Sequence, residues 1–348
     1  MVKGIEKPRV IAFEVTGRCR FNCRHCRASA GISGEQDNLT TAQCKRIVRR
    51  VGDYVRPEGR AVLILTGGEP MEREDIYKLA AYGSKRGFRV VMATCGYLLD
   101  DGAAERLKEA GIAGLSFSLD GASAQTNDSI KETSGAFEAV VRATRIAKKA
   151  GIEFQINSTI SKLNMDEVFG IGEAAERLGA KCFNPFVLVP MGRGEQMVDE
   201  ILDPLEYEVL LNELLRVKME SGIEVRVTCA PALARIVRQK RFERLTDDVS
   251  GCMAGRGFVF ISRRGDVQTC GFLDVSAGNL VENNYNFGKI WRESEFLGEI
   301  RDFSKYKGRC GVCEYLSVCG GCRARAFAVC GDYLGEDPVC SYQPRRKK

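Results

Sequence analysis

Short apolar runs alternate with amphipathic segments over the first two thirds of the chain. Six runs rich in Val, Ile, Leu and Phe have the length and composition of buried β-strands. They occupy residues 10–15, 61–66, 89–94, 114–119, 153–160 and 181–189. Between them, apolar positions recur at the spacing of amphipathic helices. These predicted helices occupy residues 40–56, 73–87, 101–110, 135–150, 165–178 and 204–221.

The ends of several predicted helices carry capping residues. Thr40 or Thr41 stands where the N-cap of the first helix is expected, and Gly87, Gly111 and Gly151 follow three of the other helices. Glycine is favoured after a helix because the backbone there commonly turns into the left-handed conformation. These boundaries support a strict alternation of strands and helices.

Six strand–helix units indicate an α/β fold with a parallel sheet and right-handed crossovers. They are too few for an eight-unit barrel, so we expect a partial (β/α)6 barrel of the TIM type. The alternation stops near residue 223, and the segment 229–341 has few recognisable helices, the clearest at 286–301. We therefore predict a core domain over 1–222 and a second domain, poor in regular structure, over 223–348.

Cysteine is unusually frequent, because the chain has fifteen cysteines, nine of them after residue 228, and one histidine. Neither a signal peptide nor a membrane helix is evident, so we expect a cytoplasmic protein that does not bind membranes. In a reducing compartment, clustered cysteines are more often metal ligands or redox groups than disulfides. The 52 Lys and Arg residues are interleaved with 46 acidic residues, which argues against a nucleic-acid partner.

The first group of cysteines directly follows the first strand. Cys19, Cys23 and Cys26 stand in the pattern C-x3-C-x2-C. On a loop, three thiolates at this spacing can converge on one four-iron cluster and leave the fourth iron without a protein ligand. The alternative is a zinc site completed by a distant cysteine.

A second motif, T-G-G-E-P at residues 66–70, ends the second strand. Gly67 and Gly68 allow the backbone to approach a ligand closely, and Glu69 beside them can hold an ammonium group. Alone, such a segment would be interpreted as a turn. Its position at the end of a strand, 40 residues after Cys26, favours a binding site.

Together the two motifs resemble the radical S-adenosylmethionine (AdoMet) superfamily, whose cysteine pattern is C-x3-C-x-aromatic-C, with His25 in the aromatic position. The resemblance implies that Cys19, Cys23 and Cys26 hold a [4Fe–4S] cluster that cleaves AdoMet. It gives His25 no acid–base role and predicts no catalytic side chain. The implied AdoMet-binding residues lie at strand ends, where ligands of parallel α/β folds gather. They are Gly67, Gly68, Glu69, Pro70, Thr94, Ser118, Asp120 and Asn157.

The cysteines of the last third resemble the SPASM extension of this superfamily, which carries one or two auxiliary [4Fe–4S] clusters. The resemblance implies two ligand sets. One is Cys310, Cys313, Cys319 and Cys340, and the other is Cys252, Cys270 and Cys322, which is one ligand short. Cys229 is the candidate for the fourth ligand, with an open or solvent-bound iron as the alternative.

This chain departs from the SPASM pattern at one spacing. It has two residues between Cys319 and Cys322 where many SPASM proteins have three. The division of these two cysteines between the clusters is therefore the least constrained part of the assignment. Of the remaining cysteines, we expect Cys44 and Cys182 to be small buried hydrophobes, and neither Cys95 nor Cys330 is assigned as a ligand.

Residues 7–31, 226–231, 251–279 and 320–340 extend the resemblance to the haem-biosynthesis branch of SPASM proteins in the siroheme-dependent pathway. Within this branch the 12,18-didecarboxysiroheme deacetylases are the most similar. The resemblance implies a tetrapyrrole substrate that loses acetate side chains through a 5′-deoxyadenosyl radical, giving iron-coproporphyrin III. It also implies a low-potential electron donor such as ferredoxin or flavodoxin. Candidate partners of the substrate carboxylates are Arg193, Arg226, Arg256 and Arg263.

Three other functions stay open. A sister enzyme of the same pathway decarboxylates iron-coproporphyrin III oxidatively, and a SPASM maturase modifies a ribosomally made peptide. The third alternative is an electron-transfer or scaffold protein without radical activity. The motif at residues 66–70 argues against the third, because a scaffold has no use for an ammonium-binding loop.

Overall fold

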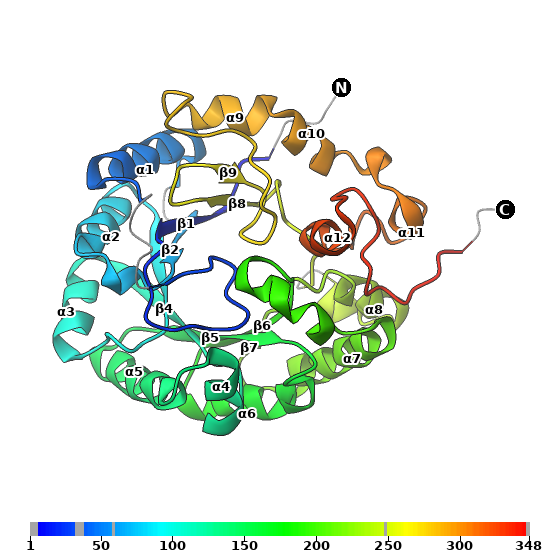
Figure 1. Cartoon of the computed structure of the whole chain (residues 1–348), viewed down its shortest axis with the longest axis horizontal. Coiled ribbons are helices and arrows are strands. Elements are labelled where there is room, and N and C mark those ends of the chain that lie inside the picture. Colours follow the sequence, from blue (N-terminus) through cyan, green and yellow to red (C-terminus); the bar gives the residue numbers. More distant parts are fainter. Residues whose placement is uncertain (1–5, 32–37, 58–59, 247–248, 346–348) are drawn as a thin grey trace.

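The computed structural model describes residues 6–31, 38–57, 60–246 and 249–345. Its strands form one curved sheet surrounded by helices (Figure 1). The strands are β1 (Val10–Thr16), β2 (Val62–Gly67), β3 (Arg89–Thr94), β4 (Ile112–Ser118), β5 (Phe154–Ile160), β6 (Cys182–Val187), β7 (Glu224–Val225), β8 (Phe258–Ile261) and β9 (Val267–Gln268).

The order in the sheet is β7-β6-β5-β4-β3-β2-β1-β8-β9, so β7 and β9 are the two edges of an open barrel. Neighbouring strands run parallel except for the antiparallel pair β8–β9. The predicted α/β fold with a partial barrel is therefore confirmed, and each of the six predicted strands is present.

The helices cover the outside of the sheet (Figure 1). They are α1 (Thr41–Val55), α2 (Ile76–Lys85), α3 (Asp101–Glu109), α4 (Ala124–Lys131), α5 (Ala136–Ala150), α6 (Val168–Leu178), α7 (Pro204–Glu220), α8 (Leu233–Gln239), α9 (Phe287–Glu293), α10 (Glu295–Arg301), α11 (Gly308–Gly311) and α12 (Arg323–Cys330). Thr40 caps α1 as predicted, because its side chain accepts a hydrogen bond from the Gln43 amide while the Gln43 side chain accepts one from the Thr40 amide.

Helix α4 was not predicted from the pattern. Its sequence, AQTNDSIK, has no apolar stripe, and its buried residues are Asn127, Ile130 and Lys131. The helix is recognisable from its N-cap, because the Ser123 side chain accepts a hydrogen bond from the Thr126 amide. Periodicity fails here because the helix buries polar groups against the site rather than apolar ones against the core.

Alternate residues of the strands face two different environments. On β5, Phe154, Ile156 and Ile160 are buried and belong to the core between sheet and helices. Gln155 and Asn157 point to the other face and are half-buried. The side-chain period of a strand is two, so this second set lines the inside of the barrel. The inner face is thus partly accessible and polar, as a ligand site requires.

Three strands come from beyond residue 222, which corrects the expected six-strand sheet to nine among the described residues. Strand β8 lies parallel to β1, with Val10 opposite Phe258 and Phe13 opposite Ile261. The segment 258–261 is too short to be recognised by pattern, and it is a strand because the edge of β1 supplies partners for its backbone. The domain boundary at 222/223 stays a prediction.

The C-terminal segment is attached to the barrel through a buried ion pair. Arg325 of α12 and Asp337 are 2.8 Å apart, and their side chains are 0% and 2% exposed. Arg325 also donates to the carbonyls of Cys229 (3.1 Å) and Leu188 (3.5 Å). A buried guanidinium needs such partners to offset its desolvation, so this arginine ties three separate segments together.

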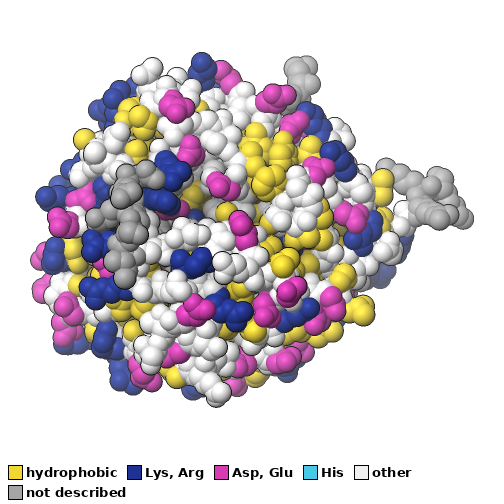
Figure 2. All heavy atoms as spheres, viewed as in Figure 1, with side chains coloured by type: hydrophobic (Ala, Val, Ile, Leu, Met, Phe, Trp, Pro, Cys, Tyr) yellow, Lys and Arg dark blue, Asp and Glu magenta, His cyan; other side chains and the backbone are white. Residues whose placement is uncertain are grey.

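The predicted helix at 286–301 is two helices. Ser294 has an extended backbone (φ −64°, ψ 124°) and separates α9 from α10. In the part of the chain that the structure describes, no helix is both long and apolar enough to cross a membrane. Acidic and basic side chains are intermixed over the face shown in Figure 2, in agreement with the interleaved charges of the sequence.

Candidate active site

The first cysteine group lies on the loop that follows β1, as predicted, and this loop crosses the centre of the ring of helices (Figure 1). Its two ends are held together where the amide of Cys19 donates to the carbonyl of Gly31 at 3.1 Å. The amide of Arg24 donates to the carbonyl of Ile130 at 3.1 Å. The loop is therefore fixed at its base and against the end of α4.

Arg193 braces the same loop from the segment after β6. Its Nε donates to the carbonyl of Cys23 at 3.0 Å, its Nη1 donates to that of Ala30 at 2.5 Å, and its amide donates to that of Cys26 at 3.0 Å. We expected Arg193 among the candidates for binding substrate carboxylates. The structure assigns it instead to the backbone of the cluster loop.

The three sulfurs lie in a partly buried environment with a cation nearby. Cys19 is buried, and Cys23 and Cys26 are half-buried. Burial raises the pKa of Cys23 to about 11, and the charge of Lys131 opposes this shift. A hydrogen bond from the neighbouring Cys95 lowers the pKa of Cys19.

This donor set fits an iron–sulfur cluster. Three thiolates supply the ligands that such clusters prefer, and a buried lysine compensates part of their negative charge. Among the described residues, no three His, Cys, Asp or Glu side chains converge closely enough for a single metal ion.

The glycine-rich motif is hydrogen-bonded to the start of the cluster loop. The amide of Gly68 donates to the carbonyl of Thr16 at 2.8 Å, and that of Glu69 donates to the carbonyl of Arg18 at 2.7 Å. A Cβ atom at Gly67 would lie 2.3 Å from the Thr16 oxygen, and one at Gly68 would lie 2.2 Å from the Arg18 oxygen. Both positions therefore require glycine for this approach.

The Glu69 carboxylate is fully buried behind the motif. It accepts hydrogen bonds from the Thr94 hydroxyl at 2.8 and 2.9 Å and from the amides of Cys95 (2.6 Å) and Met71 (3.1 Å). Burial nevertheless raises the pKa of Glu69, although these hydrogen bonds oppose the shift. Pro70 begins the short 3₁₀ turn that follows. The structure thus brings the predicted residues Glu69 and Thr94 into direct contact.

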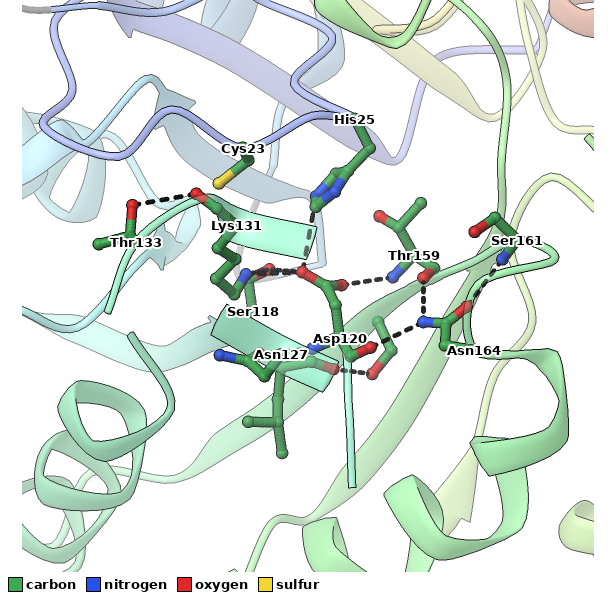
Figure 3. A network of polar contacts seen from close by, with 12 residues as sticks. Cys23, His25, Ser118, Asp120, Asn127, Lys131, Thr133, Thr159, Ser161 and Asn164 are labelled. Atoms are coloured by element: carbon green, nitrogen blue, oxygen red, sulfur yellow. Dashed lines mark hydrogen bonds and ion pairs between the residues drawn. The ribbon is translucent and has the colours of Figure 1, made fainter. Parts of the chain in front are cut away.

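Asp120 is the centre of a buried polar network beside the cluster loop (Figure 3). Its carboxylate lies 2.6 Å from Lys131 Nζ and 3.6 Å from His25 Nε2, and it accepts a hydrogen bond from the Thr159 amide at 2.7 Å. Lys131 Nζ also donates to the Ser118 hydroxyl at 2.8 Å. The predicted residues Ser118 and Asp120 therefore share one cation, which sequence reasoning missed.

Lys131 is buried, with 1% of its side chain exposed. Although burial alone would lower its pKa, the charge of Asp120 opposes this and the pKa of Lys131 rises. The ion pair also holds the pKa of Asp120 below its usual value despite burial. His25 stays neutral, because burial lowers its pKa. The network therefore presents a fixed ammonium group next to Cys23.

Asn157 does not join this network. It lies on the inner face of β5 and accepts a hydrogen bond from the side chain of Gln155 at 2.8 Å. Both side chains are half-buried. The position agrees with a role in the lumen of the barrel, and its contact with AdoMet stays a prediction.

The structure gathers four of the C-terminal cysteines near the barrel. Cys322 shares a hydrogen bond with Cys229 and lies within electrostatic range of Cys252 and Cys270. The bond from Cys229 lowers the pKa of Cys322 to about 7, whereas burial raises that of Cys270 to about 12. Cys229 itself has left-handed backbone torsions (φ 58°). The candidate fourth ligand therefore lies beside the set that it was expected to complete.

Four of the five other C-terminal cysteines form a second group, which does not include Cys330. Cys310, Cys313, Cys319 and Cys340 line one pocket between α8 and the C-terminal segment. Arg323 of α12 donates from Nη2 to the sulfur of Cys310 at 3.5 Å. This grouping agrees with the division that the resemblance implies, including Cys319 in one set and Cys322 in the other. That these residues hold clusters stays a prediction.

The remaining cysteines and arginines considered in the sequence analysis lie at separate places in the fold. Cys44 and Cys182 are buried and Cys330 is exposed. Arg226 pairs with Glu224 at the surface. Arg256 donates to the carbonyls of Cys252 (3.4 Å) and Ile300 (2.9 Å). Of the four arginines expected near substrate carboxylates, Arg263 is the one that contacts the buried Glu14 of β1, at 2.6 Å.

Known proteins resemble this chain over its whole length. A profile of the Radical SAM superfamily matches residues 13–173. The AdoMet-dependent heme synthase of Methanosarcina barkeri (strain Fusaro / DSM 804) is 42% identical over 360 residues, which cover 100% of both chains. Two further proteins of that name are 39% identical. The Fe-coproporphyrin III synthase of the same organism is 31% identical over 96% of this chain and 88% of its own length.

The chain is a radical AdoMet enzyme of haem synthesis. Membership implies a [4Fe–4S] cluster and AdoMet as its cofactors. Among solved structures, Streptococcus suis SuiB bound to precursor peptide SuiA has a TM-score of 0.76 at 18% identity, over 97% of this chain and 77% of that one. Likeness at this identity establishes the shared fold alone.

For this radical AdoMet enzyme, the sequence revealed the motifs but not the contacts that Lys131 and Arg193 make with them. Lys131 and Arg193 are single charged residues in polar segments, and neither has a spacing that distinguishes it from a surface residue. The segment N-D-S-I-K that ends in Lys131 lies a few residues after the end of β4, and this proximity to a strand end is the one available signal.

The close approach of Gly68 to the Arg18 carbonyl can be tested by substitution. In Gly68→Ala, the added methyl group would force the motif away from the cluster loop, and a displacement of about 1 Å can lower a rate about 100-fold. We expect 5′-deoxyadenosine formation to fall by about this factor. Gly31→Ala is the matched control, because a Cβ there would meet no atom of the described residues within 4 Å. Equal 5′-deoxyadenosine formation by the two variants would contradict the requirement for glycine at residue 68.

The buried pair Lys131–Asp120 generates a second test. Lys131→Met leaves the Asp120 charge buried and uncompensated, which costs about 3–5 kcal/mol. We expect a lower midpoint of denaturant unfolding, and a partial recovery in the double variant Lys131→Met/Asp120→Asn. The control is Lys149→Met, because Lys149 and its partner Asp101 are 73% and 66% exposed and such pairs contribute less than about 1 kcal/mol. The same midpoint in both lysine variants would contradict a structural role for Lys131.

Proposed function

We propose that this enzyme is a haem synthase that converts propionate side chains of iron-coproporphyrin III into vinyl groups. The proposal rests on the difference in sequence identity between this chain and two named relatives. The chain is 42% identical to a protein named AdoMet-dependent heme synthase and 31% identical to one named Fe-coproporphyrin III synthase, both from one organism. Since both comparisons span nearly the whole chain, the difference favours oxidative decarboxylation.

Deacetylation of 12,18-didecarboxysiroheme, which the sequence resemblance favours, is the second candidate. Its support is the relative named Fe-coproporphyrin III synthase. The two reactions belong to the same pathway and use the same type of radical. They differ in the side chain that must be presented to the radical, which is acetate in one case and propionate in the other.

The net reaction of each propionate balances as follows. The group –CH2–CH2–COO⁻ becomes –CH=CH2 with release of CO2, one hydrogen atom and one electron. The cluster and AdoMet, when bound, supply the 5′-deoxyadenosyl radical that accepts the hydrogen atom. The protein must therefore orient the propionate, exclude water and provide an acceptor for the electron.

The residues of the site suit the first two tasks. Glu69 offers a buried carboxylate for the amino group of AdoMet, and Lys131 offers a fixed cation near the cluster loop. Residues on the inner face of the strands are half-buried, so a substrate could contact them. In a site shielded from bulk water these fixed charges act more strongly than they would at the surface.

We infer that the C-terminal cysteines bind two auxiliary [4Fe–4S] clusters and that these accept or relay the electron. One would be held by Cys229, Cys252, Cys270 and Cys322, and the other by Cys310, Cys313, Cys319 and Cys340. The pairing of Cys229 with Cys322 and the hydrogen bond from Arg323 to Cys310 support this division. A low-potential donor such as ferredoxin or flavodoxin would supply the electron that AdoMet cleavage consumes.

Peptide modification is a weaker alternative. The structural likeness to SuiB, which was solved with its precursor peptide, rests on 18% identity and concerns the fold. Sequence identity is higher to the protein named AdoMet-dependent heme synthase, at 42%, than to the one named Mycofactocin maturase MftC, at 29% over 97% of this chain.

The deciding experiment compares two substrates. Anaerobically reconstituted enzyme, reductant and AdoMet are incubated with iron-coproporphyrin III or with didecarboxysiroheme, and 5′-deoxyadenosine and tetrapyrrole mass are followed. We expect haem and CO2 from the first substrate and no change in the second. The inactive control is Gly68→Ala.

Each other outcome contradicts the proposal in a different way. Conversion of didecarboxysiroheme alone would establish the deacetylase instead. Deoxyadenosine formation with both tetrapyrroles unchanged would retain the radical chemistry and exclude the tetrapyrrole substrate. No deoxyadenosine at all would favour an electron-transfer protein.

The auxiliary clusters are tested by iron content. Cys252→Ala and Cys313→Ala should each lower the iron content by about four per chain, because each variant removes a ligand of a different cluster. Each should reduce haem formation more than AdoMet cleavage, since the electron from decarboxylation loses its acceptor. Cys330→Ala is the control, because Cys330 is exposed and lies outside both groups. Unchanged iron in the first two variants would exclude the assignment.

A further inference from the structure

A buried carboxylate on the inner side of β1 is shared by two arginines. Glu14 Oε2 lies 3.0 Å from Arg27 Nη1, and Glu14 Oε1 lies 2.6 Å from Arg263 Nη1. The Glu14 side chain is 4% exposed. Among the described residues, two positive charges therefore share a single negative one, and the group carries a net positive charge.

This group lies between the two regions that the reaction would connect. Arg27 directly follows Cys26, and its guanidinium lies 4.5 Å from the ring of Phe260 on β8. A Cβ at Gly271, the neighbour of Cys270, would be 3.2 Å from Arg27 Nε. Arg263 follows the end of β8, which is parallel to β1. The two arginines thus face the inside of the barrel between the cluster loop and the loop that carries Cys270.

Both guanidinium groups have N–H donors for which the described residues provide no acceptor. Each has five N–H donors, and the hydrogen bonds to described residues use one donor of each, on Glu14. Arg263 Nε is buried without a partner. The side chains are 18% and 23% exposed, in contrast to Arg325, which is 0% exposed and pairs one-to-one with Asp337. In the Arg325–Asp337 pair, by contrast, one positive charge meets one negative charge.

We propose that Arg27 and Arg263 bind a side-chain carboxylate of the substrate, and that Glu14 is a positioning residue that holds both guanidinium groups toward it. A guanidinium pairs with a carboxylate through two parallel hydrogen bonds, and the net positive charge favours an added anion. The inference rests on the proposed tetrapyrrole function and adds the residues that recognise its carboxylates.

Binding can be measured without turnover. Reconstituted enzyme with AdoMet is titrated with iron-coproporphyrin III, and the absorbance change of the tetrapyrrole is followed. We expect Arg263→Gln and Arg27→Gln each to weaken binding about 10- to 100-fold, the range for hydrogen bonds to a charged group. Arg263→Lys should recover part of the loss. Arg226→Gln, which alters an exposed pair, is the matched control and should bind like the wild type.

The tetramethyl ester of iron-coproporphyrin III identifies the interacting group. It lacks the carboxylate charge, so wild type and variants should bind it equally weakly. Circular dichroism shows whether each variant is folded, and iron content shows whether it carries its clusters. One arginine variant that meets both criteria is sufficient for the test. Tight binding of iron-coproporphyrin III by both glutamine variants would overturn the proposal, as would a defect confined to AdoMet affinity.

If the haem-synthase assignment is wrong, the titration gives a different result. If the wild type does not bind iron-coproporphyrin III, the titration is repeated with didecarboxysiroheme, which also carries carboxylates. Weakened binding of that compound in the arginine variants would support the carboxylate site while contradicting the haem-synthase assignment. If the wild type binds neither compound, both proposals are wrong.

Discussion

The geometry of the site depends on the contact between the backbones that follow two neighbouring strands. Two amide hydrogen bonds join the glycine-rich motif after β2 to the start of the cluster loop after β1, at distances of 2.8 and 2.7 Å. Only glycine allows this approach at residues 67 and 68. Because β1 and β2 are parallel partners in one sheet, their ends meet at one edge. The cysteines and the buried Glu69 are thereby held in a fixed relation before any cofactor binds.

Buried charges arranged around this contact are compensated in two ways. Asp120–Lys131 and Arg325–Asp337 are one-to-one pairs with almost no exposed surface, and they fix α4 and α12 against the barrel. The group at Glu14 differs, since two partly exposed arginines share one carboxylate. Burying charge is unfavourable unless it is paired. An excess of positive charge at the inner face therefore points to an anionic ligand, whereas the neutral pairs point to structure.

The C-terminal third is integrated with the barrel more closely than a separate domain would require. Strand β8 extends the sheet from β1, and Cys229 and Cys270 pack against a cluster of buried residues that includes Val189, just after β6. Arg27, adjacent to a ligand of the first cluster, reaches the loop that carries Cys270. In the proposed reaction, a radical formed at one cluster and an electron accepted at another would act on one substrate. The shared sheet provides the rigid connection that such a reaction needs.

Much of this protein was predictable from local pattern. The six strands of the core, the cysteine spacing and the glycine-rich motif are contiguous features, so periodicity and spacing reveal them. The roles of Cys19, Cys23, Cys26 and Glu69 in holding cofactors stay predictions. Contacts between segments far apart in the sequence were not predicted. Lys131 lies on a helix without an apolar stripe, β8 is a strand only because β1 offers it partners, and Arg193 reaches the cluster loop from more than 160 residues away. The sequence determines which groups are present and their local conformation. The tertiary structure decides which charges meet, because burial and pairing arise only when distant segments pack together.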